Sequence, residues 1–319
     1  MTIALGAGPW QAALGGYNSS HCYQAGEGEG ERMRIGAHVS TAGGLEKGIE
    51  RAEAMGAETI QIFGAPPQSW RRKAYPAQEA EAFRTLAAAA DIWPVFIHAV
   101  YLVNLATSNP ENLIKSQDAL IADMVLSSAI GARGVIFHIG SHRGAGYAKV
   151  FGQIVDSVRR VLAETPEDTW LILENSAGMG DSVGRKLGEL AAIMKEVASP
   201  RVKVCFDTQH AFSAGYDVAT AAGLAATMDE FEREVGLAHL VAIHANDSKC
   251  PLGGGVDRHE NIGEGHIGRA GFEVIVAHPA FRDLPFLLEV PGFPKEGKKA
   301  EGPDKENVDR LKAIVGVEG

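Results

Sequence analysis

Six short apolar runs recur along this chain, and each one ends on a histidine, an aspartate or a glutamate. The runs WPVFIH, RGVIFH, WLILE, VKVCFD, LVAIH and PFLLE end at His98, His138, Glu174, Asp207, His244 and Glu289. Successive ends lie 33 to 45 residues apart, which is enough for a strand, a loop and a covering helix. Buried parallel strands read as continuous apolar runs, and a (β/α)8 barrel gathers their carboxyl ends at one mouth. The pattern therefore predicts an α/β fold, a single (β/α)8 (TIM) barrel with its active site at the C-terminal ends of the strands.

The alternation of strands and helices begins at Arg34 and continues to the end of the chain. Two further apolar runs, RIGAH and ETIQIF, complete a set of eight strands. Helices are expected at about residues 45–55, 77–90, 110–130, 147–162, 186–197, 218–235, 271–277 and 305–315. Residues 1–33 lack an amphipathic period, so we expect a poorly structured N-terminal extension ahead of a catalytic barrel at 34–319. The sequence leaves open whether translation begins at Met1 or at Met33, directly before the first strand.

Composition excludes several other classes of protein. No run of about 20 apolar residues is present, so no membrane-spanning helix is expected. The three cysteines, Cys22, Cys205 and Cys250, lack CxxC spacing, which argues for a reducing compartment such as the cytoplasm and against a disulfide framework or a thiolate zinc site. The net charge of −10 argues at first against a polyanionic partner, but three divalent ions would add about six positive charges at the mouth. An acidic chain is thus compatible with a phosphate-bearing substrate.

Two loop segments add ligand-type residues at short spacing. Asp207-Thr-Gln-His210 follows the sixth strand as an expected tight loop, and Asp257-Arg-His259 lies in the long loop after the seventh. With the strand ends they give five histidines and four carboxylates, a nitrogen and oxygen set that suits zinc or manganese better than calcium or magnesium. A single such residue is more often a hydrogen-bonded core group, or a helix cap in the case of Asp207 or Glu289. Six aligned ends favour a site for two or three ions with a bridging carboxylate, whereas His38 is expected to line the floor without binding metal.

One loop has the composition of a nucleic-acid contact. After the second strand, GAPPQSWRRKAY places three cations and two aromatic side chains at the rim of the barrel. Basic side chains meet phosphates, and aromatic ones stack on bases or wedge between them. The alternative is a solvated loop with Trp70 tucked onto the barrel. A weaker alternative for a phosphate contact is the loop Gly263-Glu264-Gly265, whose backbone could cradle an anion.

The chain from about residue 33 to residue 318 resembles the endonuclease IV family of metal-dependent apurinic/apyrimidinic endonucleases. The matching stretches are GAHVSTAGGL, HAVYLVNLA, LENSAGMG, CFDTQHAFSAGYD, HANDSK, VDRHENIGEGHIG and PFLLE. They are long and cover nearly the whole barrel. The resemblance implies a TIM barrel that holds three metal ions, usually zinc, with manganese as an alternative at one site.

The resemblance also implies how the nine candidate ligands divide. The first ion takes His98, His138 and Glu174; the second takes Asp207, His244 and Glu289, with Glu174 bridging; the third takes His210, Asp257 and His259. Glu174 is therefore the expected catalytic centre of the site. Tyr101 matches a position that probes DNA beside the lesion, and Gln68 stands where some members carry an arginine that enters the base stack. The expected DNA contacts are Tyr101, Gln68, Trp70, Arg71 and Arg72.

The activity implied is hydrolysis of the phosphodiester on the 5′ side of an abasic site in double-stranded DNA. The products would be a 3′-hydroxyl and a 5′-deoxyribose phosphate, and the enzyme is expected to act as a monomer without a membrane partner. One alternative is a metal-dependent sugar isomerase or epimerase on the same barrel, which has no need of the third ligand set. Another is a catalytically silent DNA-binding module, which the intact ligand set argues against.

Overall fold

The computed structural model describes residues 32–294 and 299–316. The expected extension at 1–33 therefore lies outside the described residues, except for its last two. Arg32 forms an ion pair with Glu58 at 2.8 Å, and Met33 is buried in the core. None of the described helices has the length and apolar character that crossing a membrane requires.

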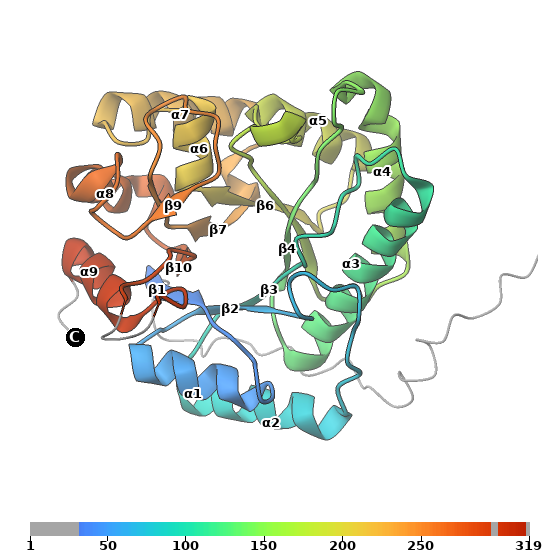
Figure 1. The fold of residues 1–319 in the computed structure, drawn as a ribbon, viewed down its shortest axis with the longest axis horizontal. Helices are drawn as coiled ribbons and strands as arrows, with labels where there is room; N and C mark the ends of the chain where they lie inside the picture. Colours follow the sequence, from blue (N-terminus) through green and yellow to red (C-terminus); the bar gives the residue numbers. More distant parts are fainter. Residues whose placement is uncertain (1–31, 295–298, 317–319) are drawn as a thin grey trace, which may run out of the picture. The chain divides into compact units, whose positions relative to one another are not determined.

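Eight parallel strands form a closed barrel, which confirms the predicted fold. They are β1 (Arg34–His38), β2 (Ile60–Phe63), β3 (Val95–His98), β4 (Gly134–His138), β5 (Trp170–Glu174), β6 (Val202–Asp207), β7 (Leu240–His244) and β10 (Pro285–Leu288). Their order around the barrel is β1-β10-β7-β6-β5-β4-β3-β2, so each strand lies beside its neighbours in the sequence. Figure 1 shows the strands at the centre, with helices outside them.

Apart from the short α6 (Thr208–Ala214), the helices follow the stretches of the sequence in which helices are expected. They are α1 (Glu46–Met55), α2 (Ala77–Ala89), α3 (Pro110–Ile130), α4 (Tyr147–Ala163), α5 (Leu187–Val197), α7 (Ala221–Glu234), α8 (Gly268–Ala277) and α9 (Lys305–Val315). Local signals set their ends. For example, the Asn109 side chain caps the amide of Asn112 at the start of α3, and Gly131 ends that helix in the left-handed region at φ 71°.

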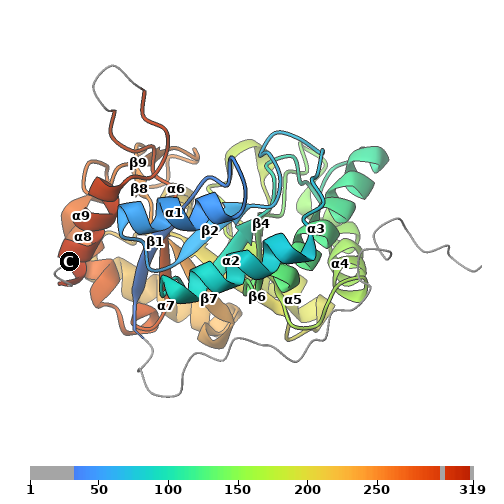
Figure 2. The same cartoon turned by 90° about the horizontal axis from the view of Figure 1, so that it is seen from below.

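Two elements differ from the expectations. The segment after Asp207 is the short helix α6 and not a tight loop. The long loop after β7 contains a small antiparallel hairpin, in which β8 (Asp247–Ser248) pairs with β9 (His259–Glu260). Figure 2 shows β8, β9 and α6 together on the upper side of that view.

The barrel has two apolar layers that position its mouth. Most buried aliphatic and aromatic side chains fill the space between the strands and the surrounding helices. A smaller cluster fills the barrel interior and consists of Phe96, Ile136, Ile172, Cys205, Ala242 and Leu287. Strand register then places polar ends side by side above it, because His138 pairs with Glu174 and Asp207 pairs with His244. The interior packing thus supports a polar layer at the carboxyl ends of the strands.

Candidate metal centre

A first group of ligand-type side chains forms at the ends of three adjacent strands. His98 closes β3, His138 closes β4 and Glu174 closes β5. The Nε2 atoms of His98 and His138 lie 3.2 and 3.6 Å from the same oxygen, Oε2 of Glu174. These three side chains offer atoms within 4.8 Å of one another, which is close enough to share one ion.

A second group faces the other oxygen of the same carboxylate. Nδ1 of His244 lies 3.0 Å from Oε1 of Glu174, 3.3 Å from Oε2 of Glu289 and 3.8 Å from Oδ2 of Asp207. These four residues form one potential metal-binding group. Glu174 is fully buried and belongs to both groups, one oxygen turned to each. Its geometry is that of a bridging carboxylate.

A third group combines α6 with the hairpin loop. The two oxygens of Asp257 lie 3.4 Å from Nε2 of His210 and 3.4 Å from Nε2 of His259. Asp207, His210 and His259 also form a potential metal-binding group. Asp207 caps α6, since its Oδ1 accepts from the amide of His210 at 2.7 Å. The fold thus brings together all nine side chains that the sequence singled out.

Three histidines are oriented by backbone carbonyl groups. Each donates its Nδ1–H to one carbonyl oxygen and turns Nε2 toward the carboxylates. The pairs are His98 with Ala99 at 2.7 Å, His210 with Asn175 at 2.9 Å and His259 with Glu289 at 3.1 Å. Nε2 of His259 is buried and has no hydrogen-bond partner among the residues that the structure describes. A buried, unpartnered nitrogen aimed at a carboxylate fits a metal ligand, so the residues present suit divalent ions such as zinc.

The electrostatics of the site follow from burial and mutual charge. Burial opposes ionisation of Glu174, but His138 and His244 hold its pKa well below the usual value. Burial opposes protonation of His210, yet Asp207 and Asp257 raise its pKa well above the usual value. In the metal-free protein, protons on His210 and His244 therefore supply cationic charge at the centre. Burial also raises the pKa of the Cys205 thiol below the site to about 11, so the thiol stays neutral.

Three carboxamides interleave with the ligands, and sequence reasoning missed all of them. Asn246 donates to Oδ2 of Asp207 at 2.7 Å and accepts from the amide of Glu289 at 2.8 Å. Asn175 accepts from the amide of Asp207 at 2.7 Å, and Gln61 contacts His244 and Glu289. The available signal was a polar residue inside or directly after an apolar strand, such as the Q of ETIQIF.

The backbone amides of the glycine loop after β9 bind a carboxylate of the protein itself, that of Asp247. Asp247 accepts hydrogen bonds of 3.0–3.2 Å from the backbone amides of Gly263, Gly265, Ile267 and Gly268. These donors are therefore occupied, which contradicts the alternative that the loop cradles a phosphate. The contacts hold the segment after His259 against β8.

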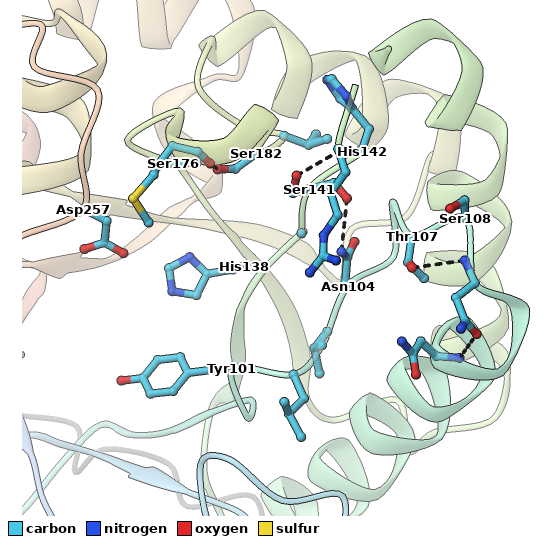
Figure 3. A pocket seen from close by; sticks show the side chains of 18 of the residues that line it. Tyr101, Asn104, Thr107, Ser108, His138, Ser141, His142, Ser176, Ser182 and Asp257 are labelled. Atoms are coloured by element: carbon cyan, nitrogen blue, oxygen red, sulfur yellow. Dashed lines mark hydrogen bonds between the residues drawn. The ribbon is translucent and has the colours of Figure 1, made fainter. Parts of the chain in front are cut away.

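A cavity of about 680 Å³ opens beside the metal-binding groups. His138, His210 and Asp257 line one part of it, and Tyr101, 59% exposed, stands at its rim. Figure 3 shows Tyr101, His138 and Asp257 on one side of the view. The other side carries neutral polar groups, Asn104, Thr107, Ser108, Ser141 and Ser182, and Arg143 also lines the cavity. The cavity thus joins the candidate metal centre to a polar surface.

The residues of the loop between β2 and α2 that are expected to touch DNA differ in their exposure. Gln68 and Arg71 are exposed, and Trp70 packs against the core while it lines the cavity. Arg72 instead forms a two-pronged ion pair with Asp123 on α3, one contact being 3.0 Å long. Its side chain is 9% exposed and that of Asp123 is fully buried. Arg72 is thus a clamp that holds the loop on α3, and its guanidinium is not presented to solvent as a phosphate contact.

Comparison with known sequences places the chain among close relatives. The xylose isomerase-like TIM barrel family matches residues 49–314. A "Probable endonuclease 4" of Methanoculleus marisnigri is 41% identical over 285 residues, which is 89% of this chain and 99% of the relative. One of Halorhodospira halophila is 42% identical over 264 residues, which is 82% of this chain and 89% of the relative.

Among solved structures, the chain is again similar to an endonuclease IV. Endonuclease IV from Thermus thermophilus superimposes with a TM-score of 0.78 at 35% identity, over 89% of this chain and all of that chain. An L-ribulose 3-epimerase superimposes with a TM-score of 0.63 at 13% identity, over 89% of this chain and 94% of its own. The second likeness shows a shared fold alone.

Proposed function

The chain belongs to the endonuclease IV family, and on this premise we propose that it hydrolyses the DNA phosphodiester on the 5′ side of an abasic site. The products are a 3′-hydroxyl and a 5′-deoxyribose phosphate. The observation that carries the proposal is the gathering of nine nitrogen and oxygen ligands at one mouth, beside a polar cavity with Tyr101 at its rim. Phosphodiester hydrolysis needs concentrated positive charge, which this acidic chain supplies through bound ions.

We propose three zinc ions, with manganese as an alternative at one position. The first is held by His98, His138 and Glu174; the second by Glu174, Asp207, His244 and Glu289; the third by His210, Asp257 and His259. When bound, such ions would lower the pKa of a coordinated water molecule toward neutrality. They would also neutralise charge on the phosphoryl and leaving oxygens. The chain supplies no separate general acid in this proposal.

The protein's own residues orient the substrate. In this proposal Tyr101, Gln68 and Trp70 fill the space left by a displaced sugar, and Arg71, an exposed cation of the loop after β2, contacts a phosphate. A missing base makes displacement of the sugar cheaper, because no base pair is lost. DNA contact is thus local to the mouth, as expected for a chain with a net charge of −10. We propose that the enzyme works as a cytoplasmic monomer, in line with the free thiols of Cys205 and Cys250.

The direct test is incision of a labelled duplex with a single abasic site. We expect metal-dependent cleavage on the 5′ side of the lesion, with a product end that a DNA polymerase can extend. As controls, the undamaged duplex should remain uncut, and the Glu174→Gln variant should lose most of the incision activity. Absence of cleavage by the zinc-loaded protein would overturn the proposal.

The same preparation tests the two alternatives. A sugar isomerase or epimerase would convert ketoses or aldoses and would retain activity without the group of His210, Asp257 and His259. A silent DNA-binding module would bind abasic duplex without a metal-dependent turnover. The endonuclease proposal requires turnover of DNA and no sugar conversion.

A further inference from the structure

Gln61 occupies an unusual place inside the barrel. It lies in β2, a strand that supplies none of the nine candidate ligands, and it is fully buried. Its Oε1 is 2.8 Å from Nε2 of His244, and its Nε2 is 2.7 Å from Oε1 of Glu289 and 3.0 Å from Nδ1 of His38. A single carboxamide therefore joins three titratable side chains at the mouth.

The carboxylate contact fixes the orientation of this amide. A carboxylate oxygen only accepts hydrogen bonds, so the group 2.7 Å from Glu289 must be the NH2 of Gln61. The amide oxygen then faces His244 and can only accept, so Nε2 of His244 must carry a proton. This leaves Nδ1 of His244 toward Glu174, Asp207 and Glu289.

We propose that Gln61 is a positioning residue of the metal centre, which fixes the Nε2–H tautomer of His244 and the orientation of Glu289. The inference rests on the proposed metal centre but not on the identity of the substrate. Gln61 contacts two ligands of the second ion and none of the ligands given to the third. Removing it should therefore weaken one ion selectively. Loss of a group that orients metal ligands typically lowers metal affinity by about 10–100-fold.

The test variant is Gln61→Met, which keeps the size of the side chain and removes all three hydrogen bonds. Zinc affinities of the full chain are measured by competition with a chelator of known zinc affinity. We expect one of three zinc ions to bind about 10–100-fold more weakly and the other two to bind as in the unaltered protein. All three affinities within twofold of the unaltered protein would overturn the proposal.

A second measurement reads the tautomer directly. The zinc-loaded protein is labelled with 15N-histidine, and the signal of His244 is assigned by its loss in His244→Asn. The unaltered protein should show a proton on Nε2 of His244 that exchanges slowly with solvent, because Gln61 accepts it, and Gln61→Met should show faster exchange of that proton. An Nδ1–H tautomer in the unaltered protein would overturn the proposal even if Gln61→Met does not fold.

Two controls separate positioning from packing. Phe96→Leu alters the neighbouring residue in register on β3 and should lower the melting temperature without changing zinc affinity or tautomer. Gln61→Glu keeps an acceptor for His244 but loses the donor to Glu289, so it should keep the tautomer and still weaken one ion. If Phe96→Leu weakens the same ion equally, packing is the cause and the proposal fails. Neither readout involves DNA, so failure of the endonuclease assay would leave this result interpretable.

Discussion

The ion pair between Arg72 and Asp123 should decide the stability of the loop that follows β2. Arg72→Met removes the cation and leaves the carboxylate of Asp123 fully buried without its partner. Breaking a buried pair in this way costs about 3–5 kcal/mol of unfolding free energy. For a domain of this size the loss should lower the melting temperature by roughly 5–10 °C.

The dependence on pH gives this prediction a sign. Burial raises the pKa of Asp123 above its usual value, and Arg72 opposes that rise. Without Arg72 the pKa of Asp123 should rise further. Protonation of Asp123 in acid then removes the cost of burying an unpaired carboxylate, and this cost grows as the pH increases. The deficit of Arg72→Met should thus be smaller at about pH 5 than at about pH 8.

Thermal unfolding followed by circular dichroism tests both points, with Arg71→Met as the matched control. Arg71 is exposed, so the same chemical change one position away should shift the melting temperature by only about 1–2 °C. The double variant Arg72→Met with Asp123→Leu should recover most of the lost stability, because no charge is left buried. Equal melting temperatures for the two single methionine variants would refute the argument.

Four further predictions concern the metal centre and the DNA contact. Glu174→Gln should remove most incision activity in the assay on abasic duplex while circular dichroism shows an intact fold; near-normal rates would exclude a bridging role. His259→Ala should lower the metal content toward about two ions per chain by elemental analysis, and slow turnover more than it weakens DNA binding. Arg71→Met should reduce the log–log salt slope of DNA binding by roughly one unit. Zinc binding above the usual pKa of histidine should release about two protons, from His210 and His244, visible by calorimetry in buffers of different ionisation enthalpy; no buffer dependence would contradict the raised pKa values.

Much of the barrel was predictable because its signals are local. Apolar runs gave the strands, and helices such as α3 and α9 have caps and breakers close to their ends. The helix α6 is not predictable from a period because seven residues are too few to show one, and the capping role considered for Asp207 does not by itself define a helix. Two-residue strands such as β8 and β9 leave no pattern at all.

The candidate site was predictable where charge interrupts apolar sequence, and unpredictable where it depends on distant partners. The nine candidate ligand residues stand out because they lie at the ends of apolar runs or in closely spaced pairs after them. The role of Arg72 depends on Asp123, 51 residues away, and that of Gln61 on residues 183 and 228 positions away. A basic loop therefore predicted one phosphate contact too many, because side-chain direction is set by tertiary packing.

Asp207 shows how this fold prepares the centre before any ion arrives. One oxygen caps α6 and so fixes the backbone of His210, while the other accepts from Asn246 and faces His244 and His259. Backbone carbonyl groups already hold the rings of His98 and His259, and the carboxamide of Asn246 accepts from the backbone amide of Glu289. Because the geometry depends on the protein's own hydrogen bonds, ion binding needs to displace protons and little else. A centre of this kind keeps its ligand directions fixed while substrate enters, and fixed charge is what phosphodiester hydrolysis requires.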